Sequence, residues 1–355
     1  MSATITAVVV SFVDPTAGSR AVESLLAQSL APLEVVVVDN GSAEGTAYAS
    51  VARELPQGVR IVGPGVNLGY TRAANLAAQE AKGEWLFFLN PDAVASKDCL
   101  ERLLEAVDDD DVAIVGGQVL LPDGRVNAGE NPVNIAGVSW SGGYGCPREY
   151  GPARDTAAVS GAALLARREA FLELGGLCPY FFMYVDDTDL AWRMRLSGRR
   201  VRYCPEAVVV HDYEFDKGPH KWFYLERNRA WALLSNLRLS TLMFLAPLLL
   251  ATEAVVVWRA FSEGWLREKA RAWASLLKRL PQLLDWRRSV QKSRRVSDYW
   301  VLQMFSAGVD TPLLDAGPPS WANRAVERYR RVVLGLLEPS AGEPSRSSAR
   351  RRAAG

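Results

Sequence analysis

Short apolar runs alternate with amphipathic segments along the first 120 residues. The apolar runs that are typical of strands occupy residues 5–12, 33–38, 59–62, 86–89 and 112–115. Segments with apolar residues at helical spacing lie between them, over about 19–29, 67–82 and 100–107. Residues 35–38 and 86–89 are apolar at every position, which is typical of parallel strands covered on both faces. Strands that alternate with helices predict an α/β domain built on a mostly parallel sheet.

Polar side chains stand where two of these predicted strands end. Residues 86–89 run directly into Asn90 and Asp92, and residues 33–38 run into Asp39. Open α/β sheets bind ligands at the carboxyl edge of their strands. Asp92, with an oxygen donor two residues earlier, suits a hard divalent cation that also holds substrate phosphates, and Asp39 is placed to accept hydrogen bonds from a base or ribose. An ordinary turn and a helix N-cap are the alternatives.

The segment 67–75 opens the helix that follows the third strand. Gly69 permits another group to approach the backbone closely, and the helix N-terminus offers N–H groups to an anion. Asn75 lies on the helix face that carries Thr71. The first crossover contains no Gly-x-Gly-x-x-Gly, so we do not expect a dinucleotide site.

Three carboxylates open a helix after the aromatic run at residues 181–184. Asp186 and Asp187 stand at its N-terminus, where the helix dipole favours negative charge. Asp189 lies about one turn from Asp186, and it can brace that residue or pair with Arg193 four residues on. An exposed acidic N-cap is the alternative, but the preceding aromatic residues favour the wall of a pocket.

Further signals come from the segments on either side of this helix. Residues 140–158 are rich in Gly, Pro and Tyr and predict a long loop of the kind that binds ligands or acts as a lid. Residues 201–210 predict two short strands that lead to His211, one of two histidines in the chain. A single histidine is more often structural, but imidazole is also a common metal ligand.

The last third of the chain has a different pattern. Residues 242–258 are apolar but interrupted by Pro247 and Glu253, which favours a re-entrant or interfacial helix pair over a membrane span. A helix packed on the catalytic domain is the soluble alternative. Residues 265–295 alternate basic and aromatic side chains and predict a basic amphipathic helix on an anionic membrane surface. The composition after residue 338 predicts disorder.

Composition narrows the classes of protein. Acidic and basic residues nearly balance, with a formal net charge of +1, and no nucleic-acid-binding motif is present, so we expect no nucleic-acid partner. The four cysteines are scattered without a Cys-x-x-Cys pair, which argues against a zinc site or a disulfide framework and fits a reducing compartment. The N-terminus lacks the pattern of a signal peptide, so we expect the cytoplasmic face of the cell membrane.

Four short motifs occur in the order seen in family 2 glycosyltransferases, at residues 8–12, 37–42, 67–70 and 88–93. The chain most closely resembles the rhamnosyltransferase-like branch of that family. The resemblance implies a GT-A fold, a dTDP- or UDP-sugar donor, Mg²⁺ or Mn²⁺, and inverting transfer to a glycan or polyprenyl-linked acceptor in cell-surface polysaccharide synthesis. We expect a GT-A domain over 1–225, a helical membrane-associating region over 226–335 and a disordered tail over 336–355.

The resemblance also assigns roles to individual residues. Asn90 replaces the first Asp of the family's Asp-x-Asp motif, which makes Asp92 the better metal ligand. The family's Glu-Asp-x-Asp motif places the catalytic base at Asp187, with Asp186 and Asp189 beside it. Relatives supply a metal contact from a histidine at the position of His211. The other expected donor contacts are Ser11, Asp39, Asn67, Gly69, Asn75, Asn90 and Arg227. The expected acceptor contacts are Gly161, Ala162 and Trp192.

Two other functions remain open at this point. A nucleotidyltransferase shares the sheet but needs a Gly-rich phosphate loop with Arg and Lys after the first strand, and residues 11–20 contain one Gly and no Lys. A non-catalytic glycan-binding scaffold would not need Asp92, Asp187 and His211 together.

Overall fold

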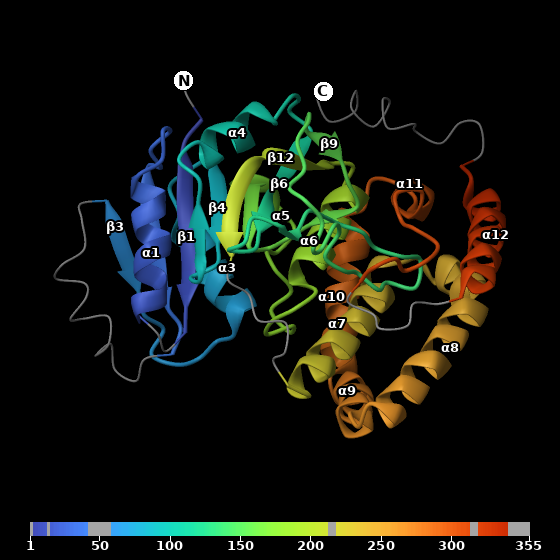
Figure 1. The fold of residues 1–355 in the computed structure, drawn as a ribbon. Helices are drawn as coiled ribbons and strands as arrows, with labels where there is room; N and C mark the ends of the chain where they lie inside the picture. The colour runs from blue at the N-terminus through green and yellow to red at the C-terminus, as the bar shows by residue number, and fades with distance from the viewer. Residues whose placement is uncertain (1–2, 13–14, 42–57, 212–217, 313–318, 340–355) are drawn as a thin grey trace. The chain divides into compact units, whose positions relative to one another are not determined.

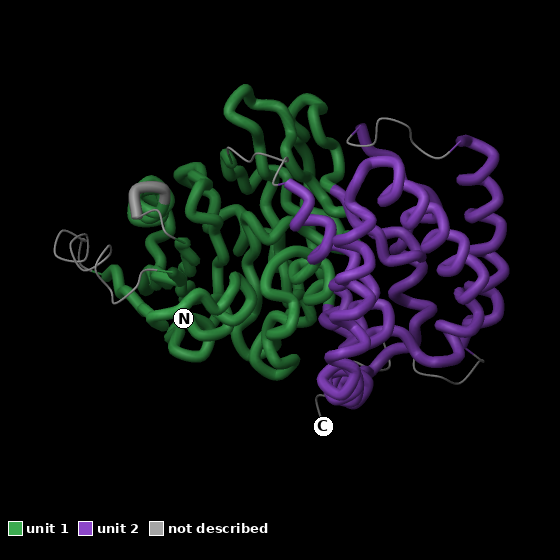
Figure 2. The backbone as a smooth tube through the Cα atoms, turned by 90° about the horizontal axis from the view of Figure 1, so that it is seen from below, with its two compact units in different colours: residues 1–131, 141–191, 200–213 green, residues 132–140, 192–199, 214–355 purple. Residues whose placement is uncertain are grey.

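The computed structural model describes residues 3–12, 15–41, 58–211, 218–312 and 319–339 (Figure 1). The chain divides into two compact units, shown in Figure 2. Unit 1 comprises residues 1–131, 141–191 and 200–213. Unit 2 comprises residues 132–140, 192–199 and 214–355. This division differs from the consecutive ranges expected from the sequence, because residues 132–140 and 192–199, which lie within the expected first domain, belong to unit 2.

Unit 1 is built on a mixed ten-stranded sheet (Figure 1). Its main path runs through β3 (Val59–Val62), β2 (Glu34–Asp39), β1 (Ile5–Ser11), β4 (Trp85–Leu89), β11 (Ala163–Arg167), β6 (Val112–Leu120), β12 (Arg200–His211) and β5 (Ala93–Ala95). Two short strands pair at its margin, β7 (Val126–Ala128) with β6 and β9 (Arg154–Asp155) with β12. A separate two-stranded sheet joins β8 (Glu130–Asn131) and β10 (Ala158–Val159).

The first four strands of this path are parallel, as their mostly apolar sequences predict. Every residue of β1, β2 and β4 is buried. The register sets Ser11 opposite Asp39 and Val9 opposite Leu89. The polar residues that end these strands therefore gather at one edge of the sheet.

Five helices begin in the part of unit 1 that the structure describes. They are α1 (Pro15–Leu26), α3 (Tyr70–Glu80), α4 (Cys99–Glu105), α5 (Arg168–Glu173) and α6 (Asp186–Leu196), whose last five residues belong to unit 2. α1 begins at Pro15, four residues before the expected start, because proline suits the first position of a helix. Ala21 and Leu25 of α1 are fully buried in the core of the sheet domain.

Two strands differ from the sequence prediction. β6 continues through Gly116 and Gly117 instead of ending before them, because each glycine leaves room for a close neighbour: a Cβ on Gly116 would overlap the side chain of Val159. β12 is one strand rather than two, with an irregularity between Cys204 and Val208 that absorbs Pro205. β5 and β11 were not predicted.

Unit 2 consists of helices in the part that the structure describes. These are α7 (His220–Asn236), α8 (Leu239–Ser262), α9 (Leu266–Lys278), α10 (Leu280–Ser293), α11 (Asp298–Leu302) and α12 (Ser320–Leu337). α8 is one continuous helix through Pro247, so the expected helix pair is wrong. The basic segment 265–295 forms two helices that part at Arg279, not one. Residues 340–355 of the expected disordered tail lie outside the described residues.

Candidate functional site

Asp92 and His211 form the first part of the site. Asp92 lies in the turn between β4 and β5, and His211 is the last residue of β12. β5 and β12 pair antiparallel with His211 opposite Ala93, and this register carries the imidazole to Asp92. The Nε2 atom of His211 is 2.9 Å from Oδ1 of Asp92 and 3.5 Å from Nδ2 of Asn90. The two expected metal ligands, which are 119 positions apart in the sequence, therefore lie within hydrogen-bonding distance of each other.

The donor atoms of this pair fit a divalent ion that is shared with a substrate. Two neighbouring ligands of an octahedral ion with bonds of about 2.1 Å lie about 3 Å apart, close to the 2.9 Å between Asp92 and His211. His211 is buried, whereas the side chain of Asp92 is 42% exposed, so the pair opens toward solvent. The described residues contain no group of three His, Cys, Asp or Glu side chains that could hold a metal. Two protein ligands leave the remaining positions to phosphate oxygens and water.

The second part of the site is the start of α6, where three carboxylates have different surroundings. Oδ2 of Asp187 accepts a hydrogen bond from the N–H of Gly161 at 2.9 Å, and Oδ1 accepts one from the N–H of Thr188 at 2.6 Å. Asp186 and Asp189 are buried, with 7% and 0% exposure, while Asp187 is only partly buried. Asp187 is therefore the most exposed of the three carboxylates.

Burial raises the pKa of both leading carboxyls. The pKa of Asp186 rises to about 8, because desolvation disfavours its charged form and the neighbouring Asp187 adds repulsion. Desolvation raises the pKa of Asp187 as well, but the N–H groups of Gly161 and Thr188 stabilise its charged form. The hydroxyl of Tyr70 is held neutral by burial and by these two carboxylates, which raise its pKa. The pair therefore favours a proton on Asp186 near neutral pH.

Residues 161–162 connect the two parts. Ala163 pairs with Leu89, and the N–H of Asn90 donates to the carbonyl oxygen of Ala162 at 3.3 Å. Gly161, the residue before Ala162, donates its N–H to the carboxylate of Asp187. The expected acceptor element thus lies between the strand end that leads to Asp92 and the expected base. Unit 1 alone brings these residues together.

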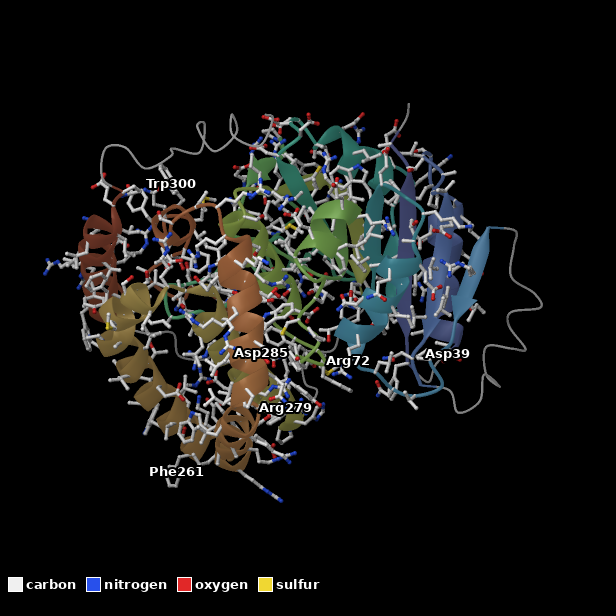
Figure 3. All side chains as sticks on the ribbon, turned by 180° about the vertical axis from the view of Figure 1, so that it is seen from behind. Asp39, Arg72, Phe261, Arg279, Asp285 and Trp300 are labelled. Carbon is white, nitrogen blue, oxygen red and sulfur yellow. The ribbon has the colours of Figure 1, made fainter. Side chains whose placement is uncertain are left out.

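The expected donor residues Ser11, Asp39 and Asn67 lie near the carboxyl edge of the parallel strands. Ser11 and Asp39 are buried neighbours on β1 and β2, and Figure 3 labels Asp39 and Arg72 at the same end of the sheet of unit 1. Oδ1 of Asn67 accepts hydrogen bonds from the N–H of Gly69 at 2.8 Å and from Nδ2 of Asn40 at 3.2 Å.

Asn40 was not singled out from the sequence. Its Oδ1 accepts the N–H of Leu68 at 2.9 Å, so Asn40 and Asn67 together shape the loop before α3. The signal that could have found it was its position directly after a strand-end carboxylate. Such a position at the carboxyl edge is where open α/β sheets shape their binding loops.

The group that lies close to the backbone of Gly69 is the ring of Phe182. The sequence predicted such a close approach but not which residue makes it. Gly69 has φ 75°, and a Cβ there would overlap the ring of Phe182. The carbonyl of Phe182 accepts the N–H of Thr71 at 3.2 Å, so the N-terminus of α3 is partly capped rather than fully open to an anion.

The loop that carries Phe182 to the base is strained. Phe182, Tyr184 and Val185 have φ of 71°, 66° and 65°, and they are the non-glycine residues with positive φ in the described part of the chain. Each such residue costs about 1–3 kcal/mol. Because they lie in the four residues before Asp186, the strain lies next to the carboxylates at the start of α6, and such strain is common at functional sites.

Three expected site residues have other partners. Both polar atoms of the Asn75 side chain bond the backbone of Leu177 at 2.8 Å, so Asn75 ties α3 to a loop. Trp192 is buried in unit 2 and packs edge-to-face on Phe305 at 4.9 Å. We leave these two residues out of the proposed site. Arg227 lies in α7 of unit 2, where it donates to Asn228 at 2.9 Å.

Comparison with known proteins decides the family. Residues 7–175 match the family model described as glycosyl transferase family 2. The N-acetylglucosaminyl-diphospho-decaprenol L-rhamnosyltransferase of Mycobacterium tuberculosis (strain ATCC 25618 / H37Rv) is 30% identical over 253 residues, which cover 64% of this chain and 79% of that protein. The chain belongs to glycosyltransferase family 2. The O-antigen chain rhamnosyltransferase WbaN of Salmonella anatum is 27% identical over 53% of this chain and 59% of its own length.

A solved structure supports the fold expected of this family 2 member. GalNAc-T7 with UDP, GalNAc and Mn²⁺ superimposes with a TM-score of 0.55 at 16% identity, over 66% of this chain and 48% of that one. Unit 1 thus has a GT-A-like fold with a mixed sheet. Membership of the family makes the chain a glycosyltransferase with a nucleotide-sugar donor, and the nucleotidyltransferase and scaffold alternatives are set aside.

Proposed function

We propose that the protein transfers rhamnose from a dTDP-sugar, with inversion, to a polyprenyl-linked glycan at the cytoplasmic face of the cell membrane. The two rhamnosyltransferase relatives support this sugar, and the decaprenol-linked substrate named for one of them supports this acceptor. The observation that carries the chemistry is that Gly161, which holds Asp187, directly precedes Ala162, which bonds Asn90 at the strand end that leads to the Asp92–His211 pair.

The reaction is a single displacement in which Asp187 is the general base. Its carboxylate accepts the proton of the acceptor hydroxyl, the oxygen bonds to the anomeric carbon, and the bond from that carbon to the diphosphate breaks with its electron pair. The N–H of Gly161 holds the carboxylate in place. Asp92 and His211 would hold Mg²⁺ or Mn²⁺, which neutralises the diphosphate charge when bound.

The surroundings of the other carboxylates support inversion. A double displacement needs a second carboxylate that reaches the sugar as a nucleophile. Asp186 and Asp189 are the neighbours of the base, and both are buried. Burial also favours the protonated form of Asp186, and a protonated carboxyl is a poor nucleophile. One accessible carboxylate at α6 fits a single displacement.

The test is donor turnover by the purified full chain. A panel of nucleotide sugars is incubated with a polyprenyl-diphosphate-linked glycan, and released nucleoside diphosphate is measured. We expect dTDP-rhamnose to be preferred and Asp187→Asn to lower turnover at least about a hundredfold with little change in donor affinity. Asp110→Asn, the same change at an exposed turn, is the matched control.

Two results would contradict the assignment. Near-normal turnover by Asp187→Asn, together with loss of turnover in Asp186→Asn, would show that Asp186 and not Asp187 is the general base. Asp189→Asn should mainly lower stability, because this side chain is fully buried. Preference for a different sugar with Asp187 still essential would overturn only the choice of donor.

A further inference from the structure

Helix α8 of unit 2 has one bare apolar face. By length and composition the helix could cross a membrane. Only 11% of its most apolar 18-residue stretch is buried in the protein. Its exposed residues recur every three or four positions and include Met243, Pro247, Leu250, Ala254, Trp258 and Phe261. This spacing places them on one stripe, which carries no charge. Thr241, Leu245 and Ala260 are buried on the protein side of the helix.

A network of ion pairs joins the middle of α8 to α7 and α9. Glu253 accepts hydrogen bonds from Lys269 of α9 at 2.6 Å and from Arg229 of α7 at 2.8 Å. Glu226 of α7 pairs with the same two cations. Glu226, Arg229 and Lys269 are buried, so the four side chains form a compact cluster that joins three helices.

This network excludes a simple membrane span for α8. Insertion across the bilayer would either separate Glu253 from Lys269 and Arg229 or draw all three charges into hydrocarbon, and both are costly. With the network intact, α8 stays against α7 and α9 and presents its apolar stripe outward. A helix that lies in the interface, with its apolar face about 5–10 Å into the headgroup region, satisfies both features.

The helices that follow α8 supply positive charge. Residues 265–295 contain ten basic and two acidic residues. The exposed basic residues in this stretch include Arg267, Arg271, Lys278, Arg279 and Arg288. Figure 3 labels Phe261 and Arg279 at the same end of unit 2, and α8 contacts α9. Apolar and basic side chains on one group of helices are the pattern of a surface that binds anionic lipid.

A hollow lies at the turn between α9 and α10. It measures about 500 Å³ and is lined by Ala274, Ser275, Lys278, Arg279 and Gln282. Two cations and two hydrogen-bonding side chains suit a phosphate group. Leu277, beside the hollow in the sequence, is 74% exposed. A phosphate in the hollow would therefore have an apolar neighbour for an acyl chain.

We propose that α8, α9 and α10 form a monotopic membrane-binding surface. The stripe of α8 lies in the boundary between headgroups and acyl chains, and the hollow takes the phosphate of an anionic phospholipid. A second copy of the chain is the other occupant to consider, but a two-fold contact would turn both sets of exposed cations toward each other. The inference deepens the proposed function, since a lipid-linked acceptor requires the enzyme to be at a membrane.

The first experiment measures binding of the full chain to vesicles of phosphatidylcholine with and without phosphatidylglycerol. Leu250→Glu should weaken binding at least about tenfold, because one large apolar side chain leaves the lipid. Lys278→Glu with Arg279→Glu should remove the preference for phosphatidylglycerol at low salt. Leu33→Glu, at a residue of unit 1 that is 53% exposed, is the matched control and should bind normally.

The second experiment measures how deeply α8 lies in the bilayer. A fluorescent label is attached to Met243→Cys, Leu250→Cys or Phe261→Cys, each in a Cys146→Ser background, because the other three native cysteines are buried. Quenchers at known depths should report similar shallow positions for all three labels. A deep label at 250 with shallow labels at 243 and 261 would show a span and overturn the proposal.

Two further results would also overturn it. One is the absence of binding to either vesicle, and the other is a dimer in sedimentation that Leu250→Glu dissociates. Donor turnover is measured on the same preparations. Lost vesicle binding with normal turnover refutes this inference alone, whereas retained binding without turnover refutes the proposed function alone.

Discussion

The contact between Gly69 and Phe182 couples the start of α3 to the loop that precedes Asp186, next to the proposed base Asp187. Gly69 precedes α3, and Phe182 stands four residues before Asp186 in a strained loop. An added Cβ on Gly69 would lie 2.9 Å from Cε2 of Phe182 and closer to two other ring atoms. Gly69→Ala must therefore displace either α3 or the loop.

The structure sets the size of the effect. At Gly69 the backbone has φ 75° and ψ 162°, a region open essentially to glycine, which costs alanine about 1–3 kcal/mol. Overlap with the ring adds about 1–3 kcal/mol. Gly69→Ala should thus lower the free energy of unfolding by roughly 2–6 kcal/mol. In a Phe182→Ala background the ring is gone, and only the backbone part of about 1–3 kcal/mol should remain.

Urea unfolding of the wild type, both single variants and the double variant measures this coupling. The double-mutant cycle should give an interaction energy of at least about 1 kcal/mol, and Gly69→Ala should lower turnover because the base loop shifts. Gly65→Ala is the matched control: its φ is 71°, and no atom lies within 4 Å of an added Cβ. Costs that add within about 0.5 kcal/mol would refute the coupling.

Three other predictions concern metal, pH and the charge network. Asp92→Ala should abolish transfer and weaken donor binding that depends on Mg²⁺ or Mn²⁺, and calorimetry with equal donor affinity with and without metal in the wild type would contradict this. The free energy of unfolding should fall as pH rises from about 4 to about 8, because the folded state keeps a proton on Asp186 that the unfolded state loses near pH 3.8. Urea unfolding of Asp186→Asn across this range should show a flatter profile, and an unchanged slope would argue against it. Lys269→Met should destabilise by about 3 kcal/mol, since Glu226 and Glu253 lose a buried partner. Urea unfolding measures this loss, and Lys278→Met, at an exposed site, should change the free energy of unfolding by less than about 0.5 kcal/mol.

The local sequence determined the parallel strands of the sheet and the polar residues at the ends of those strands. A strand covered on both faces is apolar over most of its length, so β1, β2 and β4 could be predicted within a residue or two. The start of α6 could be predicted because carboxylates favour a helix N-terminus. The resemblance to family 2 then assigned roles to Asp92, Asp187 and His211, and the family itself is confirmed.

The tertiary structure alone decided which of these residues meet and which face away. His211 reaches Asp92 through strand pairing across 119 residues, and Gly161 reaches Asp187 through the antiparallel strand β11, which local patterning did not predict. Likewise, the apolar pattern of α8 did not show that Glu253 is held by Lys269. Hydrophobic spacing specifies how much of an element is buried, but pairing register and the partners of buried charges depend on residues far away in the chain, so only the folded arrangement determines them.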